Sequence, residues 1–96
     1  MARRHYLVSY DITDDKRRTK VFRTLNDYGD RAQYSVFFCE LSSTELAMLT
    51  SLLKQCIKPT EDQVMILDLG KAEHELTSRL ECIGVRYDPP CRVIVV

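Results

Sequence analysis

The sequence contains no tryptophan and has only three glycines, three prolines and two histidines among its 96 residues. Three glycines are too few for a glycine-rich phosphate-binding loop, and no P-loop, H-E-x-x-H or G-x-S-x-G motif occurs. Neither His5 nor His74 belongs to a catalytic pattern, which disfavours a serine nucleophile activated by histidine. The common motifs of nucleotide-binding and hydrolytic enzymes are therefore missing.

Long hydrophobic runs are also missing. No apolar run approaches the roughly 20 residues of a membrane span, and residues 1–5 lead into an alternating pattern without the apolar core of a signal peptide. We therefore expect a cytoplasmic protein without a membrane anchor. The four cysteines form no C-x-x-C pair, so we expect reduced thiols in apolar surroundings and no zinc site. These cysteines are Cys39, Cys56, Cys82 and Cys91.

Charge of one sign does not dominate, because 14 basic and 14 acidic side chains cancel. Their placement is uneven, since residues 1–31 hold eight basic and five acidic side chains. A basic N-terminal third is compatible with a polyanionic partner. Taken alone, however, the charge pattern favours the simpler interpretation of a solvated helix face.

The first third of the chain has the pattern of a strand followed by a helix. Residues 6–12 are rich in β-forming apolar residues, which predicts a central strand. Thr13 or Asp14 can cap the following helix, which we expect to run to about Tyr28. Gly29 is well placed to end that helix in the left-handed conformation.

The rest of the chain predicts further strands and one more helix, within one α/β domain over residues 1–96. Residues 31–41 are extended, Ser42 and Glu45 form a capping box, and an apolar stripe follows at helical spacing. Residues 63–69 predict a strand, whereas residues 71–84 fit either a helix or a short strand.

Residues 85–96 contain a Pro-Pro linker and a very apolar terminal strand. An exposed strand of this kind promotes aggregation unless it is paired. We therefore expect it to pair with a second protomer in a homodimer, which also suits the small core of a chain this short.

Residues 10–18 are the one stretch whose side chains suggest chemistry. Asp11 closes the first strand, and a carboxylate there could hold Mg²⁺ through hard oxygen contacts. Arg18 falls near the apolar face of the helix in its first turn, so we expect it to project past the sheet toward the strand end. Such an arginine could bind phosphate oxygens. From spacing alone, a turn aspartate beside solvated arginines is the favoured interpretation.

Two segments, YDITDDKRR at 10–18 and YGDRAQYSVF at 28–37, closely resemble the CRISPR-associated Cas-two family. The resemblance implies an α+β, ferredoxin-like βαββαβ sandwich. It also implies a homodimer in which the C-terminal strand joins the sheet of the other protomer. This fold requires a bend near residues 33–35 that divides the extended stretch into two strands.

The resemblance further implies a role in CRISPR spacer acquisition beside the Cas-one integrase, with Mg²⁺-dependent endonuclease activity on RNA or DNA described for many members. Carried over by position, Asp11 is the metal ligand. The other implied site residues are Tyr10, Arg18, Arg31 and Phe37, and the implied nucleic-acid contacts are Arg17, Arg18, Lys20 and Arg31. Ala32 and Lys20 depart from the bulkier aliphatic residue and the arginine expected at their positions.

Three functions remain open at this point. The first is a metal-dependent phosphodiesterase in which two copies of Asp11 share one Mg²⁺, although one carboxylate per chain is sparse for that chemistry. The second is a catalytically inactive, DNA-binding dimer that bridges integrase dimers through contacts to the DNA backbone. The third is a small-molecule regulatory domain, since a ferredoxin-like fold does not determine function.

Overall fold

The computed structural model describes residues 2–88, and its elements follow the order β-α-β-β-α-β. This order confirms the ferredoxin-like α+β architecture expected from the sequence. The elements are β1 (Arg4–Asp11), α1 (Asp15–Asn26), β2 (Asp30–Gln33), β3 (Val36–Leu41), α2 (Ser43–Cys56), β4 (Gln63–Lys71) and a short 3₁₀ turn, η1 (Leu76–Arg79).

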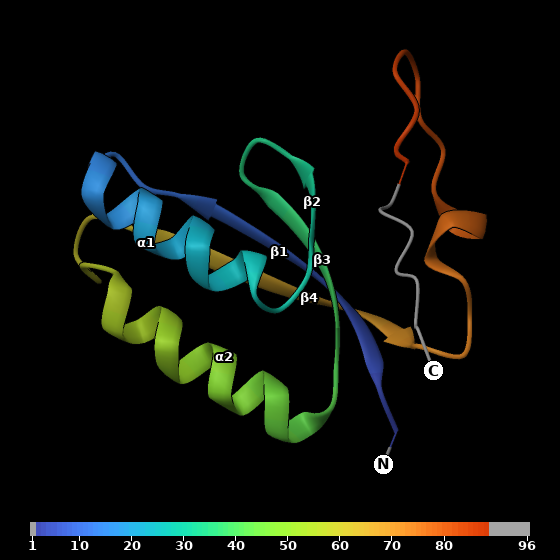
Figure 1. Cartoon of the computed structure of the whole chain (residues 1–96), viewed down its shortest axis with the longest axis horizontal. Coiled ribbons are helices and arrows are strands. Elements are labelled where there is room, and N and C mark those ends of the chain that lie inside the picture. Colours follow the sequence, from blue (N-terminus) through green and yellow to red (C-terminus); the bar gives the residue numbers. More distant parts are fainter. Residues whose placement is uncertain (1, 89–96) are drawn as a thin grey trace, which may run out of the picture.

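The four strands form one antiparallel sheet in the order β2-β3-β1-β4. The apolar strand β1 is central, with Tyr6 opposite Cys39 on one side and Leu7 opposite Leu67 on the other. Both long helices lie side by side against one face of the sheet (Figure 1). We call this the helix face and the other side the open face.

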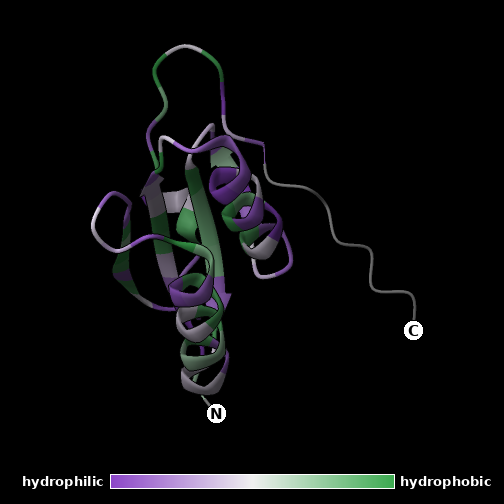
Figure 2. Cartoon of the chain, turned by 90° about the vertical axis from the view of Figure 1, so that its left-hand side faces the viewer, coloured by the Kyte–Doolittle hydropathy of each residue, from purple (hydrophilic) through white to green (hydrophobic). Residues whose placement is uncertain are grey.

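The core lies between the helix face and the two helices. Alternate residues of β1 and β3 are buried there, as the two-residue period of a strand requires. Val21 and Leu25 from α1 and Leu49 and Leu53 from α2 complete the same cluster. Figure 2 shows this pattern as mostly hydrophobic strands beside helices that alternate between hydrophilic and hydrophobic residues.

Side chains satisfy the first free amides of both helices. Asp14 caps α1 by accepting a hydrogen bond of 2.9 Å from the Arg17 amide. At α2, the Glu45 amide donates to Ser42 Oγ (3.2 Å), while the Ser42 amide donates to Glu45 Oε1 (2.9 Å). The predicted cap and the predicted capping box are both confirmed.

The expectation for Gly29 is wrong. Within residues 2–88 a positive φ occurs only at Gly70 and Gly84. Instead, α1 ends with the Gly29 amide donating to the Leu25 carbonyl at 2.9 Å. Glycine is needed there because β3 passes very close: an added Cβ would contact the Phe38 carbonyl oxygen and lie 2.5 Å from Cys39 Sγ.

The extended stretch from 31 to 41 is divided at Tyr34 and Ser35, as the βαββαβ fold requires. Residues 71–84 form neither a full helix nor a strand beyond the end of β4, and contain only η1. The terminal strand, the Pro-Pro linker and Cys91 lie outside the described residues. Cys39 is buried, Cys56 is half-buried and Cys82 is exposed, and all three are free thiols.

An ion pair between Arg17 and the buried carboxylate of Asp62 fixes α1 to the loop before β4. The Arg17 guanidinium donates from Nε to Asp62 Oδ2 (2.7 Å) and from Nη2 to Asp62 Oδ1 (3.2 Å). Asp62 also accepts from the Lys58 amide at 2.8 Å, and its side chain is fully buried. The Arg17 hydrogen bond, followed by the Lys58 amide, holds the pKa of Asp62 below its usual value.

None of the helices in residues 2–88 combines the length and the apolar character needed to cross a membrane.

The Asp62 pair predicts a pH dependence of stability. Its pKa is lower in the folded than in the unfolded state, so the pair stabilises the fold above the unfolded value of about 3.9. That stability is lost as the pH falls through the folded pKa. We expect the free energy of unfolding, measured by urea denaturation, to fall between about pH 5 and pH 3. Asp62→Asn should lower it at neutral pH and flatten the decline.

Asp27→Asn removes the same charge from the exposed end of α1 and serves as the matched control. The free energy of unfolding of this control should fall with decreasing pH as steeply as that of the unmodified protein. An Asp62→Asn curve parallel to that of the control would contradict the stabilising role of the pair.

Candidate nucleic-acid interface

A pocket of about 220 Å³ opens where the end of β1, the first turns of α1 and the β2–β3 turn meet. It therefore brings together three of the residues predicted from the sequence, namely Tyr10, Arg18 and Arg31. No acidic side chain lines it. The lining residues are Tyr10, Arg18, Thr19, Phe22, Arg31 and Tyr34. We call it the arginine pocket.

Arg18 extends from α1 across the end of β1, as its position near the apolar helix face predicts. Its Nη1 donates to the carbonyl oxygens of Ile12 (2.9 Å) and Thr13 (3.3 Å). Its Nη2 forms an ion pair with Asp15. The Asp15 hydrogen bond is the main cause of the raised pKa of Arg18, and the Tyr34 phenol contributes to a smaller degree. The guanidinium is thus charged and held in place at the pocket wall.

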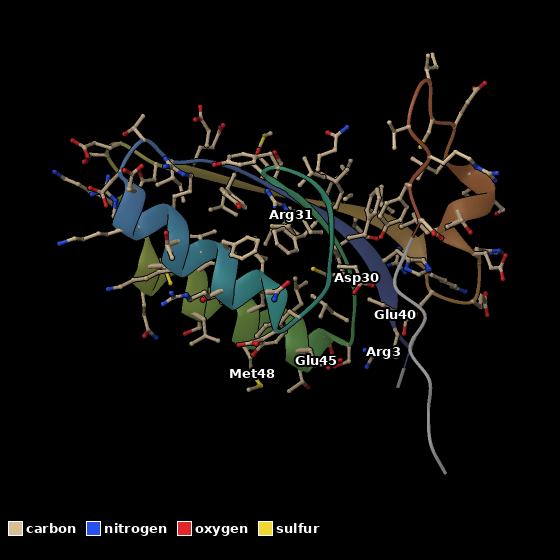
Figure 3. The ribbon with its side chains drawn as sticks, turned by 45° about the horizontal axis from the view of Figure 1, so that its top comes forward. Arg3, Asp30, Arg31, Glu40, Glu45 and Met48 are labelled. Atoms are coloured by element: carbon tan, nitrogen blue, oxygen red, sulfur yellow. The ribbon has the colours of Figure 1, made fainter. Side chains whose placement is uncertain are left out.

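Arg31 lies between two aromatic rings. Its Cζ atom is 5.2 Å from the centroid of the Phe22 ring and 5.1 Å from that of the Tyr34 ring. These are cation–π distances. Nε and Nη2 donate to the carbonyls of Gln33 (3.3 Å) and Tyr34 (3.2 Å). In Figure 3, Arg31 lies beside the hairpin, away from the group formed by Arg3, Glu40 and Glu45 near the start of α2.

Tyr10 forms the floor of the arginine pocket and rests on Phe37. The two rings are stacked with centroids 6.4 Å apart, and Phe37 also meets Phe22 edge-on at 5.8 Å. Burial raises the pKa of Tyr10 in spite of the nearby Arg31 and Arg18. Its hydroxyl therefore stays protonated and donates to the Tyr34 carbonyl at 3.4 Å. Phe37 is fully buried, so it supports Tyr10 from below and is not part of the surface.

Asp11 is not part of this pocket. It follows Tyr10 in β1, and successive side chains of a strand point to opposite faces, so Asp11 belongs to the open face opposite Gln63. It is exposed, and within residues 2–88 no hydrogen bond or ion pair engages its carboxylate. The same residues contain no group of three or more His, Cys, Asp or Glu suited to a metal. Asp11 offers the oxygen donor that Mg²⁺ prefers, but one chain supplies a single carboxylate.

The other two basic residues predicted from the sequence, Lys20 and Arg17, also lie outside the arginine pocket. Lys20 is exposed on α1 and lines no part of the arginine pocket. Arg17 is engaged by Asp62 and, through Nη2, by Glu61 at 3.1 Å. The Arg17 guanidinium thus donates its hydrogen bonds to carboxylates. By contrast, Arg18 and Arg31 donate mainly to backbone carbonyl oxygens.

Sequence reasoning missed Phe22, Thr19 and Tyr34. Phe22 has a signal in its spacing, because it follows Arg18 by one helical turn and so lies beside it. Tyr34 had a weaker signal, as an aromatic residue at a predicted strand break. Its approach to Arg31 depends on the hairpin geometry, which no local pattern encodes.

Comparison with known proteins places the chain in a family. Residues 4–76 match the family model described as CRISPR associated protein Cas2. A relative from Geobacter sulfurreducens, named CRISPR-associated endoribonuclease Cas2, is 35% identical over 91 residues, which are 95% of each chain.

Solved structures with a similar fold support the same family assignment. The crystal structure of a hypothetical protein from Thermus thermophilus is 33% identical, with a TM-score of 0.77 over 92% of this chain and 99% of that one. A chain of a partial Cas6-RT-Cas1–Cas2 complex is 27% identical, with a TM-score of 0.70 over 99% of this chain and 100% of that one. By its sequence and its fold, the chain belongs to the CRISPR-associated protein Cas2 family.

Proposed function

We propose that this protein binds the sugar-phosphate backbone of nucleic acid through the arginine pocket and acts with a Cas1 integrase in CRISPR spacer acquisition. Family membership supports the biological role, and a structural neighbour comes from a complex that contains Cas1. We propose that the protein acts in the cytoplasm, where such a partner and substrate would be found.

The observation that carries this proposal is the meeting of Arg18 and Arg31 at one pocket without an acidic lining residue. Guanidinium groups bind phosphate oxygens with strong, charge-assisted hydrogen bonds. Because such contacts do not read bases, binding should be independent of sequence and strongly weakened by salt.

The catalytic part of the proposal rests on Asp11 and on relatives that are named endoribonucleases. Mg²⁺ is usually bound through one or two carboxylates and several waters. Two copies of Asp11, one from each protomer, would suit that requirement. When bound, Mg²⁺ would activate water and neutralise charge at phosphorus. Asp11 would hold the ion, and exposure of its carboxylate on the open face leaves it accessible from a second chain.

The open face and the outer edge of β4 support a homodimer. Met65 and Leu67 of β4 are 55% and 57% exposed, and within residues 2–88 the outer edge of β4 pairs with no strand. An unpaired apolar edge is a surface that proteins normally cover. We propose that residues 85–96 act as the linker and pairing strand, adding to the sheet of the partner.

A second candidate function is a catalytically inactive scaffold that bridges integrase dimers on DNA. The separation of Asp11 from the arginine pocket favours it, because the carboxylate and the phosphate-binding side chains belong to opposite faces of the sheet within one chain. The two functions share the same basic surface and differ only in the role of Asp11.

The binding prediction concerns Arg18→Ala. The logarithm of the association constant for duplex DNA falls linearly with the logarithm of the salt concentration. Loss of one phosphate contact should make this slope shallower by about 1, measured by fluorescence anisotropy. Arg23→Ala removes the same charge from an exposed position on the same helix and should leave the slope nearly unchanged. Equal effects of the two substitutions would show that the pocket holds no phosphate.

The catalytic prediction concerns Asp11→Asn. We expect cleavage of labelled single-stranded RNA or duplex DNA by the pure protein in Mg²⁺, no cleavage in EDTA, and a loss of at least about 100-fold in the variant. Cleavage by both proteins alike would contradict a role for Asp11. Binding without cleavage in either protein would leave the scaffold function in place.

The dimer prediction concerns Leu67→Glu. Sedimentation equilibrium should give about twice the 11.2 kDa mass of one chain for the unmodified protein and a single-chain mass for the variant, because the charge would be buried at the interface. Leu52→Glu, at an exposed position of α2 on the other layer, is the control and should remain dimeric. A variant at Leu67 with unchanged mass would exclude the open face as the interface.

A further inference from the structure

Tyr34 is an aromatic residue with 72% of its surface exposed, yet its backbone carbonyl is hydrogen-bonded and its ring contacts the Arg31 guanidinium. It lies in the turn between β2 and β3, where an exposed tyrosine contributes little to the core. Exposed aromatic rings that are held rigidly are well suited to binding, because little conformational freedom is lost when a ligand docks.

Three hydrogen bonds hold the turn through its backbone. The Tyr10 amide donates to the Ser35 carbonyl at 3.1 Å, and the Tyr10 hydroxyl donates to the Tyr34 carbonyl at 3.4 Å. Arg31 Nη2 donates to the same Tyr34 carbonyl at 3.2 Å. None of the three uses the Tyr34 side chain, so the turn can keep its shape when that side chain is changed.

The Tyr34 ring forms one wall of the arginine pocket. The Arg31 guanidinium lies 5.1 Å from its centroid and covers one face, while the phenol is near enough to Arg18 to interact with its charge. The large exposed fraction leaves the other face of the ring open to solvent. A flat apolar surface thus adjoins two phosphate-binding side chains.

We propose that the open face of Tyr34 stacks an unpaired base, while Arg18 and Arg31 hold the adjoining phosphate. This inference rests on the nucleic-acid binding proposed above and names the form of nucleic acid that the site prefers. Stacking of bases on aromatic side chains beside a basic groove is a general mode of single-strand binding.

The preference for unpaired bases follows from geometry. Inside a duplex both faces of each base are covered by neighbouring base pairs, so the Tyr34 ring has no free base to contact. Phosphates are available in both forms. Tyr34 therefore adds affinity for single strands alone, whereas Arg18 adds affinity for both.

A different role for Tyr34 makes a different prediction. If the ring served only to position Arg31 by the cation–π contact, its removal would weaken binding of single strands and duplexes equally. The ratio of the two affinities, rather than either one alone, separates the two roles.

The test compares Tyr34→Ala and Tyr34→Phe with the unmodified protein. Binding is measured by anisotropy with a single-stranded oligothymidylate of about ten nucleotides and with a duplex of equal length. Tyr34→Ala should weaken single-strand binding at least about fivefold and leave duplex binding within about twofold of the unmodified protein. Tyr34→Phe, which keeps the ring, should bind both as before. Unchanged thermal unfolding verifies that the variants are folded.

Direct contact can be read by fluorescence, because the sequence has no tryptophan. In Tyr34→Trp the single indole should be quenched by the oligothymidylate and not by the duplex. Met48→Trp places an indole at an exposed position of α2 and should show no quenching by either.

Equal losses of single-strand and duplex affinity in Tyr34→Ala would overturn the inference and leave Tyr34 as a positioning residue for Arg31. Unchanged single-strand binding in Tyr34→Ala, with weaker binding in Arg18→Ala, would overturn the stacking role alone. If Arg18→Ala also binds single strands and duplexes normally, the proposed nucleic-acid binding at the arginine pocket fails together with the stacking role of Tyr34.

Discussion

Tyr10 links the hydrophobic core to the surface where we place nucleic-acid binding. Its ring is buried on Phe37, while its amide and its hydroxyl hold the carbonyls of Ser35 and Tyr34. Packing of the central strand therefore determines the position of the β2–β3 turn. The Tyr34 carbonyl of this turn accepts a hydrogen bond from Arg31 and so holds its guanidinium. The pocket is therefore built directly on the core.

The alternation of side chains along β1 divides the molecule into two working surfaces. Tyr10 faces the helices and the arginine pocket, and its neighbour Asp11 belongs to the open face. A single chain thus presents the basic and aromatic side chains of the arginine pocket on one side of the sheet, and Asp11 together with the exposed Met65 and Leu67 on the other. In our account, the first surface meets nucleic acid and the second meets another copy of the chain.

Local chemistry made much of the fold predictable from the sequence. The caps at Asp14 and at Ser42 depend on residues within one helical turn, and the apolar periods of the strands are also local. The prediction for Gly29 is wrong because the constraint on this residue comes from β3, a contact distant in sequence. The break at Tyr34 was expected only by resemblance, since the apolar pattern runs through it.

The candidate site was less predictable for the same physical reason. Arg18 could be singled out because a charge in the first turn of an apolar helix face must project beyond the sheet. The meeting of Arg31 with Phe22 and Tyr34, and the engagement of Arg17 by Asp62, are tertiary contacts between distant segments. Charge counting alone treats Arg17 and Arg18 as equivalent, whereas in the fold Arg17 pairs with the buried Asp62 carboxylate and Arg18 lines the arginine pocket.

The most direct test of this account is an NMR titration that follows the arginine Nε–H resonances while a single-stranded oligonucleotide is added. The account predicts that the resonances of Arg18 and Arg31 shift first and most, while those of Arg17 and Arg23 stay near their free positions. Shifts confined to arginines outside the pocket, with Arg18 and Arg31 unmoved, would contradict it.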